Sequence, residues 1–330
     1  MIKKLLLIFL LTYPQFSHSS VEVDFNIWLK KFKITAHEEG ISEETINNSL
    51  KNAKYLEQVI KYDRYQPEFF EDTKTYIKKR ATRSRMLKAK GLLIKNKKLF
   101  DEVEKEFKVE KELLLALWGI ETNFGKHVGK MDIISSLATL SFDKRRSEFF
   151  SKELIILLKL IDQKLVDVDT LYGSWAGAFG NFQFMPSSIE NYAIDYDKNN
   201  KIELKQSLPD AVASAANYIS KIGWEYQSSC FHKVELTKPI SKKYINTSAK
   251  KIKNYLTIKL WKKKGIVDIE QISDKNKAAL IIPDLAVSEG SMNSPAFLVF
   301  ENYEKILKWN RSLRFGVTVC TLANMIKNEI

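Results

Sequence analysis

The chain has 330 residues, of which 45% are hydrophobic and 28% are charged, and its formal net charge is +13. This is enough apolar sequence for one large core or two modest ones. The basic balance favours an anionic partner: nucleic acid, a membrane surface or a polymer rich in carboxylates. No basic run is interleaved with aromatic residues, and no helix-turn-helix or zinc-finger spacing is present, so we expect no nucleic-acid partner.

Residues 1–19 are typical of a secretory signal. Lys3 and Lys4 give a positive start, residues 5–11 are apolar, and residues 17–19 supply small side chains before a cleavage point. The apolar stretch is too short for a transmembrane helix. No Cys lies near the cleavage point to carry a lipid anchor. We therefore expect an exported protein that is soluble after cleavage.

The pattern from residue 20 to residue 107 predicts an N-terminal helical domain. Ser42 is expected to cap a helix whose first turn carries Glu43 and Glu44, where the helix dipole favours acidic side chains. A long helical stretch from Asp72 through Lys98 is dense in Lys and Arg, which is typical of a solvated face.

Glu121 closes a run, Leu113 to Ile120, that is apolar on every side and therefore predicts a buried helix. Glu is rarely buried, so a Glu at this place needs a reason. Burial favours the protonated form of a carboxyl group, which a general acid requires. A helix-end Glu that turns out to water is the alternative, and this stretch alone leaves it open.

A second informative stretch covers residues 173–188 and combines three glycines, small residues and aromatic residues. This composition suits the wall of a groove, where backbone approaches a ligand and aromatic faces stack on it. Before it, apolar spacing predicts helices at 131–140 and 147–164. After it, Pro186 and Pro209 mark the first turns of two more helices.

Residues 195–206 place oxygen-bearing side chains at alternate positions, as at the start of an EF-hand calcium loop. The ligands expected from this spacing are Asp195, Asp197, Asn199 and Lys201. The sixth position is Asn200 instead of Gly, although Asn tolerates the left-handed conformation well. The twelfth position is Gln206 instead of an acid. A merely polar turn is the alternative, and both interpretations stay open.

The character of the chain changes between residues 227 and 296. Short strands are expected there between Lys- and Ser-rich turns, at 234–236, 256–261 and 278–282. No Gly/Ser/Pro linker precedes this part, so it suits a small β lobe folded against the core. The last stretch, 297–330, is expected to be helical. Cys230 and Cys320 could pair in an oxidising compartment, but two buried free thiols are equally open.

Together, residues 119–125 (GIETNFG) and 173–188 (GSWAGAFGNFQFMPSS) resemble the lytic murein transglycosylase B family, lysozyme-like enzymes that cleave peptidoglycan glycan strands. The resemblance continues through shorter segments at 62–69, 136–142, 296–300 and 307–312. It implies a mainly α (α+β) fold. Its parts would be an N-terminal helical domain at 20–107, a lysozyme-like core at 108–226, a small β lobe at 227–296 and a C-terminal segment at 297–330 that completes the core.

The resemblance implies cleavage of the β-1,4 bond between N-acetylmuramic acid and N-acetylglucosamine, which leaves a 1,6-anhydro end. Glu121 would act first as acid and then as base. Most glycosidases use two carboxylates, but neither Asp132 nor Asp143 sits in a motif that commits it to a groove. A hydrolytic muramidase and a non-catalytic peptidoglycan-binding scaffold stay open as alternatives.

The resemblance also assigns substrate contacts. Ser174 and Gln183 would position the sugar or the acid through hydrogen bonds. Arg145 and Arg146 would face the acidic peptide stems of the polymer, with a solvated pair as the alternative. The other expected contacts, mostly aromatic, are Tyr76, Phe182, Phe184, Tyr218, Tyr303, Trp309 and Asn310. For Tyr76 a helix-surface tyrosine is the alternative, and for Tyr218 a core tyrosine.

No cofactor is implied for the chemistry, and a structural Ca²⁺ is the ion that the loop at 195–206 would hold. Asp210 matches the late carboxylate of the family's elongated loop, at a spacing one residue longer here. The implied location is the periplasm, in cell-wall turnover, with peptidoglycan strands as partner. Proteins of cell-wall synthesis or division are further candidates for partners, and we expect a monomer.

Overall fold

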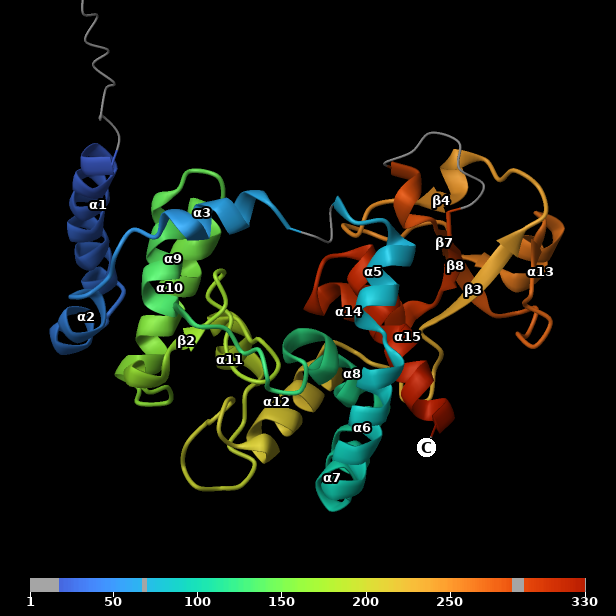
Figure 1. Ribbon diagram of the computed structural model, residues 1–330, viewed down its shortest axis with the longest axis horizontal. Coiled ribbons are helices and arrows are strands. Elements are labelled where there is room, and N and C mark those ends of the chain that lie inside the picture. The colour runs from blue at the N-terminus through green and yellow to red at the C-terminus, as the bar shows by residue number, and fades with distance from the viewer. Residues whose placement is uncertain (1–17, 67–69, 287–293, 330) are drawn as a thin grey trace, which may run out of the picture.

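The computed structural model describes residues 18–66, 70–286 and 294–329. The expected signal at 1–19 therefore lies almost wholly outside the described residues. Figure 1 shows a helical body with a small lobe of strands at one side. None of the helices in the described ranges combines the length and the apolar character that a membrane span needs.

The N-terminal part is helical, as predicted. Its helices are α1 (His18–Glu38), α2 (Glu43–Leu50), α3 (Glu57–Arg64), α5 (Thr73–Arg80), α6 (Arg83–Lys95) and α7 (Lys97–Phe107). Ser42 caps α2 by accepting a hydrogen bond from the Thr45 N–H, at 3.2 Å. The single stretch expected from Asp72 to Lys98 is wrong, because the chain breaks after α5 and the Thr82 side chain caps α6.

The middle and the end of the chain supply the remaining helices of the body. They are α8 (Lys111–Thr122), α9 (Ile133–Phe142), α10 (Ser147–Asp162), α11 (Pro186–Tyr192), α12 (Leu208–Lys221), α14 (Glu301–Trp309) and α15 (Leu313–Glu329). A short ribbon of β1 (Met131–Asp132) and β2 (Tyr172–Gly173) and a 3₁₀ turn, η1 (Val168–Thr170), lie among them. Apolar side chains of the N-terminal helices and of the later helices of the body, from Phe25 on α1 to Ile326 on α15, form one continuous hydrophobic core. The N-terminal helices are therefore not a separately packed unit.

Six short strands lie in the described residues of the β lobe. They are β3 (Phe231–Leu236), β4 (Ile245–Asn246), β5 (Leu256–Thr257), β6 (Ile266–Val267), β7 (Lys277–Ile281) and β8 (Ala296–Val299). The order is β4-β7-β8-β3-β6, with β5 also paired to β7. A second hydrophobic core lies here around Trp261, which is fully buried.

The structure corrects two expectations in the lobe. Residues 256–261 are not one strand, because β5 ends at Thr257 and α13 (Ile258–Lys263) follows. The expected boundary between 296 and 297 falls inside β8, which pairs with both β3 and β7. The C-terminal segment therefore contributes a strand to the middle of the sheet before it turns helical.

The two cysteines are joined. The disulfide between Cys230 and Cys320 links the residue before β3 to α15, with 6.2 Å between the Cα atoms. It thus ties the lobe to the helical body across 90 residues of sequence.

Candidate active site

The candidate site is built on the end of α8. The buried run predicted at Leu113 to Ile120 is confirmed, because residues 113–119 are all buried. The helix ends in three consecutive left-handed residues, Asn123, Phe124 and Gly125, with φ values of 51°, 60° and 78°. This sharp end leaves Glu121 in the last helical turn, half buried.

Asn181, from the second motif, holds this helix end in place. Its side-chain oxygen accepts from the Trp118 indole N–H at 3.0 Å, and its backbone oxygen accepts from the Thr122 hydroxyl at 2.8 Å. The Thr122 oxygen in turn accepts from the Gly125 N–H. A Cβ at Gly125 would lie 2.7 Å from the Asn181 oxygen, so only glycine fits. The two motifs are therefore parts of one structure, and sequence reasoning had singled out no role for Asn181.

Glu121 does not turn out to water. One of its carboxylate oxygens accepts a hydrogen bond from the Trp309 indole N–H at 2.9 Å. Trp309 closes α14 and is 188 residues away in the sequence. The hydrogen bond argues against a Glu that is held only by water, and it places Trp309 directly beside Glu121.

Aromatic rings extend from Trp309 as a stack. Tyr218 lies on Trp309 with 4.9 Å between ring centroids and 24° between planes, and Tyr192 lies on Tyr218 at 4.2 Å and 4°. Burial, and secondarily the neighbouring Tyr192, raises the pKa of the Tyr218 hydroxyl. Sequence reasoning missed Tyr192, although its place on the short helix after the second motif was a usable signal.

We expected Phe182 and Phe184 to offer stacking faces to a ligand, but the structure buries both rings. Each is only 2% exposed. Both rings meet Trp309 edge-on, at 6.4 and 5.4 Å between centroids. They pack against the half-buried Trp309 and help to hold the aromatic stack in place.

Two expected tyrosines are also buried. Tyr303 is fully buried, and its hydroxyl donates to the Leu313 carbonyl at 2.6 Å. It fills the core between α14 and α15 and lines no groove. Tyr76 is 4% exposed, and the Arg80 guanidinium lies 3.7 Å from its ring centroid. Neither ring can stack on a sugar, and Tyr76 is not a helix-surface residue either.

Ser174 and Gln183 hold the loop of the second motif. The Ser174 hydroxyl accepts from the Ala178 N–H at 3.0 Å. The Gln183 amide donates to the Val128 and Gly180 carbonyls, at 3.1 and 3.0 Å. Both side chains are half buried and keep part of their hydrogen-bonding capacity for a ligand. Asn310 is half buried and ends α14, next to Trp309.

Arg145 and Arg146 are both committed to a buried carboxylate. Asp63, on α3, accepts hydrogen bonds from each guanidinium and also pairs with Arg64 at 2.6 Å. Burial raises the pKa of the Asp63 carboxyl, but the hydrogen bonds and charges of Arg145 and Arg146 outweigh it, so the pKa lies below its ordinary value. This cluster joins α3 to the start of α10, and only the exposed sides of the arginines remain for a substrate.

The Asp63 cluster predicts a pH dependence of stability. The pKa of Asp63 in the folded protein lies below its ordinary value, which applies to the unfolded chain. The ionised carboxylate therefore contributes its full stabilisation at pH values above the ordinary pKa. This stabilisation is lost as the pH falls through the pKa of the folded protein. Asp63→Asn should therefore reduce stability at pH 7 and flatten its decline below about pH 5. Urea unfolding at several pH values measures this. Asp24→Asn, on the exposed face of α1, should keep the wild-type profile, and an unchanged profile in Asp63→Asn would contradict the prediction.

Asp132 and Asp143, the two aspartates considered as a second carboxylate beside Glu121, both make structural contacts. Asp132 caps α9 by accepting from the Ser135 N–H at 2.5 Å. Asp143 pairs with Arg64 at 2.9 Å. The expectation that neither is committed to the groove agrees with these contacts.

The loop at 195–206 has the geometry of a cation site. Carboxylate oxygens of Asp195, Asp197 and Asp210 lie within 4.8 Å of one another. Asp210 is fully buried, and its carboxylate accepts from the backbone N–H groups of Tyr196, Asp197 and Glu203. Three carboxylates this close favour a hard divalent cation.

The rest of the loop follows the expected conformation. Asn200 is left-handed, with φ of 66°, where the standard loop has glycine. The Asn199 side-chain oxygen accepts from the Lys201 N–H at 2.9 Å. The structure therefore brings together three of the five predicted ligands, the three aspartates, and the extra residue before Asp210 does not displace it.

Comparisons with known proteins match this description. The sequence profile of the transglycosylase SLT domain matches residues 24–324. Membrane-bound lytic murein transglycosylase B of Escherichia coli (strain K12) is 43% identical over 117 residues, which is 35% of this chain and 32% of the relative. The matched segment thus spans about a third of the length of that curated relative.

Solved structures superpose over almost the whole chain. SltB3 from Pseudomonas aeruginosa, in complex with NAG-NAM-pentapeptide, has a TM-score of 0.80 at 30% identity, covering 92% of this chain and 79% of that one. The Escherichia coli lytic transglycosylase Slt35, in complex with calcium, has a TM-score of 0.76 at 24% identity, covering 93% and 94%. These superpositions confirm the mainly α, lysozyme-like fold with a small β lobe.

Proposed function

Because the chain belongs to the transglycosylase SLT domain family, we propose that it is a lytic transglycosylase of peptidoglycan. Its substrate would be glycan strands whose muramic acid carries peptides, the class of ligand held by SltB3. It would cleave the β-1,4 bond from N-acetylmuramic acid to N-acetylglucosamine.

One observation carries the proposal: Glu121 stands in the last turn of a buried helix with its carboxylate on the Trp309 indole, beside a stack of aromatic rings. A half-buried carboxyl group that is held by a hydrogen bond is suited to proton transfer. Aromatic faces beside it suit the apolar faces of sugar rings. A wall-binding scaffold would have no need of the carboxyl group.

The reaction needs one acid and no water. Glu121 gives its proton to the glycosidic oxygen as the bond to C1 of muramic acid breaks, so N-acetylglucosamine leaves as an alcohol. The Glu121 carboxylate then takes the proton from the C6 hydroxyl, whose oxygen closes on C1. The product is a 1,6-anhydro ring, and the enzyme is again protonated. A single carboxyl group suffices because the C6 hydroxyl replaces the water that paired carboxylates activate.

The test is mass spectrometry of purified peptidoglycan after incubation with the mature protein. The proposal expects fragments that end in 1,6-anhydro-muramic acid. Reducing ends would instead identify a hydrolytic muramidase. Intact strands that nevertheless bind the protein would identify a scaffold.

The proposal places the protein in the periplasm, in cell-wall turnover. The charged start and apolar stretch within residues 1–19 support export. The Cys230–Cys320 disulfide supports it independently, because disulfides persist in oxidising compartments. We keep a monomer as the expected state and proteins of cell-wall synthesis or division as candidate partners.

A structural Ca²⁺ at Asp195, Asp197 and Asp210 is part of the proposal. These three carboxylates fit a hard cation, and Slt35 was solved with calcium on a similar fold. The ion would hold the loop between α11 and α12. It would take no part in the chemistry, which Glu121 carries.

Calcium should stabilise the protein. A ligand present at 100 times its Kd adds about 2.7 kcal/mol to the free energy of unfolding. We therefore expect Ca²⁺ at about 1 mM to raise the melting temperature of EDTA-treated protein by roughly 5–10 °C. Asp210→Asn should lose this response, while Asp169→Asn, on the exposed η1 turn, should keep it. If Ca²⁺ does not change the melting temperature of the wild-type protein, the loop is a polar turn and not a calcium site.

A further inference from the structure

A basic cleft of about 340 Å³ opens between the loop that follows β4 and the turn from α14 to α15. Its cationic lining residues are Lys250, Arg311 and Arg314, and hydroxyl groups of Ser248 and Ser312 lie with them. No acidic side chain belongs to the lining, as far as the described residues go.

Two of the three cations are not neutralised. Arg314 is buried and pairs with Asp284 at 2.8 Å. Arg311 and Lys250 are exposed, and neither forms an ion pair with any acid in the described ranges. This distinguishes Arg311 from Arg145 and Arg146, which share the carboxylate of Asp63. The basic cleft therefore presents uncompensated positive charge, which favours an anionic ligand.

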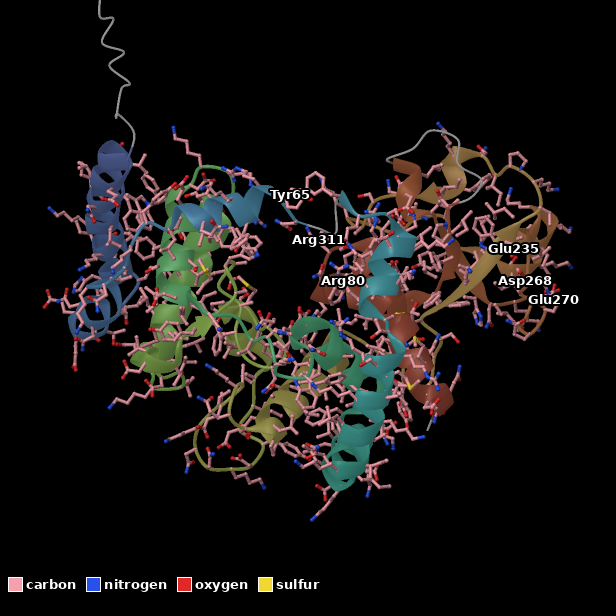
Figure 2. All side chains as sticks on the ribbon, in the orientation of Figure 1. Tyr65, Arg80, Glu235, Asp268, Glu270 and Arg311 are labelled. Atoms are coloured by element: carbon pink, nitrogen blue, oxygen red, sulfur yellow. A yellow bond between two sulfur atoms is a disulfide. The ribbon has the colours of Figure 1, made fainter. Side chains whose placement is uncertain are left out.

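The basic cleft lies close to the candidate active site. Arg311 follows Trp309, the partner of Glu121, by two residues, and Asn310 between them is extended. Two residues span at most about 7 Å. In the view of Figure 2, Arg311 lies toward Tyr65, the residue that follows α3. An extended pentapeptide spans about 17 Å, so a peptide on a sugar held at Glu121 can reach the basic cleft.

We propose that the basic cleft binds a carboxylate of the peptide carried by muramic acid, with Arg311 as its principal partner. A guanidinium binds a carboxylate through paired, charge-assisted hydrogen bonds, and Lys250 adds a second positive charge. The inference rests on the proposed function, because that function supplies the peptide-bearing strand. Arg311 would thus select strands that still carry acidic peptides, in contrast to the chemistry, which Glu121 performs.

The test is a thermodynamic cycle measured by isothermal titration calorimetry. The ligands are NAG-NAM-pentapeptide and the same fragment with its carboxylates converted to amides. For the wild-type protein, amidation should weaken binding about tenfold, as expected for one charge-assisted contact. Arg311→Gln should bind the acidic fragment about tenfold more weakly than the wild type. In that variant, amidation should cause no further loss.

Two further variants sharpen the cycle. Arg311→Lys should retain part of the discrimination, because it keeps the charge but not the paired geometry. Lys259→Gln removes one positive charge from α13, which Figure 1 shows at the outer edge of the lobe, and should behave as wild type. If amidation weakens Arg311→Gln as much as wild type, or leaves wild type unaffected, the inference is wrong.

Failure of the two proposals can be told apart. If the wild-type protein produces 1,6-anhydro ends but the cycle shows no coupling between Arg311 and the carboxylates, only the proposed role of the basic cleft is wrong. If the cycle shows coupling but the protein does not cleave strands, only the proposed enzymatic activity is wrong. Strands left intact, together with no binding of either fragment, would overturn both.

Discussion

Glu121→Gln is expected to lower the rate of strand cleavage by about 10²–10⁴, the usual contribution of a general acid–base group. The amide has nearly the shape of the carboxyl group, and its oxygen can still accept from the Trp309 indole. It cannot give a proton to the glycosidic oxygen or take one from the C6 hydroxyl. The measurement is the initial rate of 1,6-anhydro product formation at saturating peptidoglycan.

The control for this variant is Glu102→Gln, the same chemical change on the exposed face of α7. It removes a surface ion pair with Lys98 at 3.8 Å, and such a pair contributes little to stability. Its rate should match wild type, and both variants should keep the wild-type melting temperature. If Glu121→Gln cleaved within a few-fold of wild type, the proton donor would have to be another group.

Loss of the Cys230–Cys320 disulfide should have the largest effect on stability. The bridge closes a loop of 90 residues. The chain-entropy relation assigns such a loop about 4–5 kcal/mol of stabilisation, because the cross-link restricts the unfolded chain. Cys230→Ser should therefore reduce the free energy of unfolding in urea by that amount. Cys230 is the better site for the change, because Cys320 is buried.

Reduction provides the matched control for the disulfide. Wild-type protein in a thiol reductant should become as unstable as Cys230→Ser, and the variant itself should not respond to the reductant. The lobe and the helical body would then be expected to separate more easily, since the bridge joins them at β3 and α15. A variant as stable as oxidised wild type would show that the bridge adds nothing.

The sequence by itself determined those features that depend on neighbouring residues. The uninterrupted apolar run before Glu121 predicts a buried helix wherever it packs. Ser42 ahead of two acids predicts a helix start. Asn200 in the loop at 195–206 takes the left-handed conformation that its side chain tolerates. Local sterics and hydrogen bonds decide such features, so they can be predicted without knowing the fold.

The tertiary structure decided which distant residues meet. The family resemblance placed Trp309 at the groove, but no residue near it indicates that its indole donates to Glu121, 188 residues away. In the same way, the family resemblance marked Phe182 and Tyr303 as groove residues, yet packing against neighbouring helices buries both. Burial depends on what covers a side chain, and the covering elements come from elsewhere in the chain. The pairing of Cys230 with Cys320 has the same cause, because only the docking of the lobe on α15 brings the two Cα atoms to 6.2 Å.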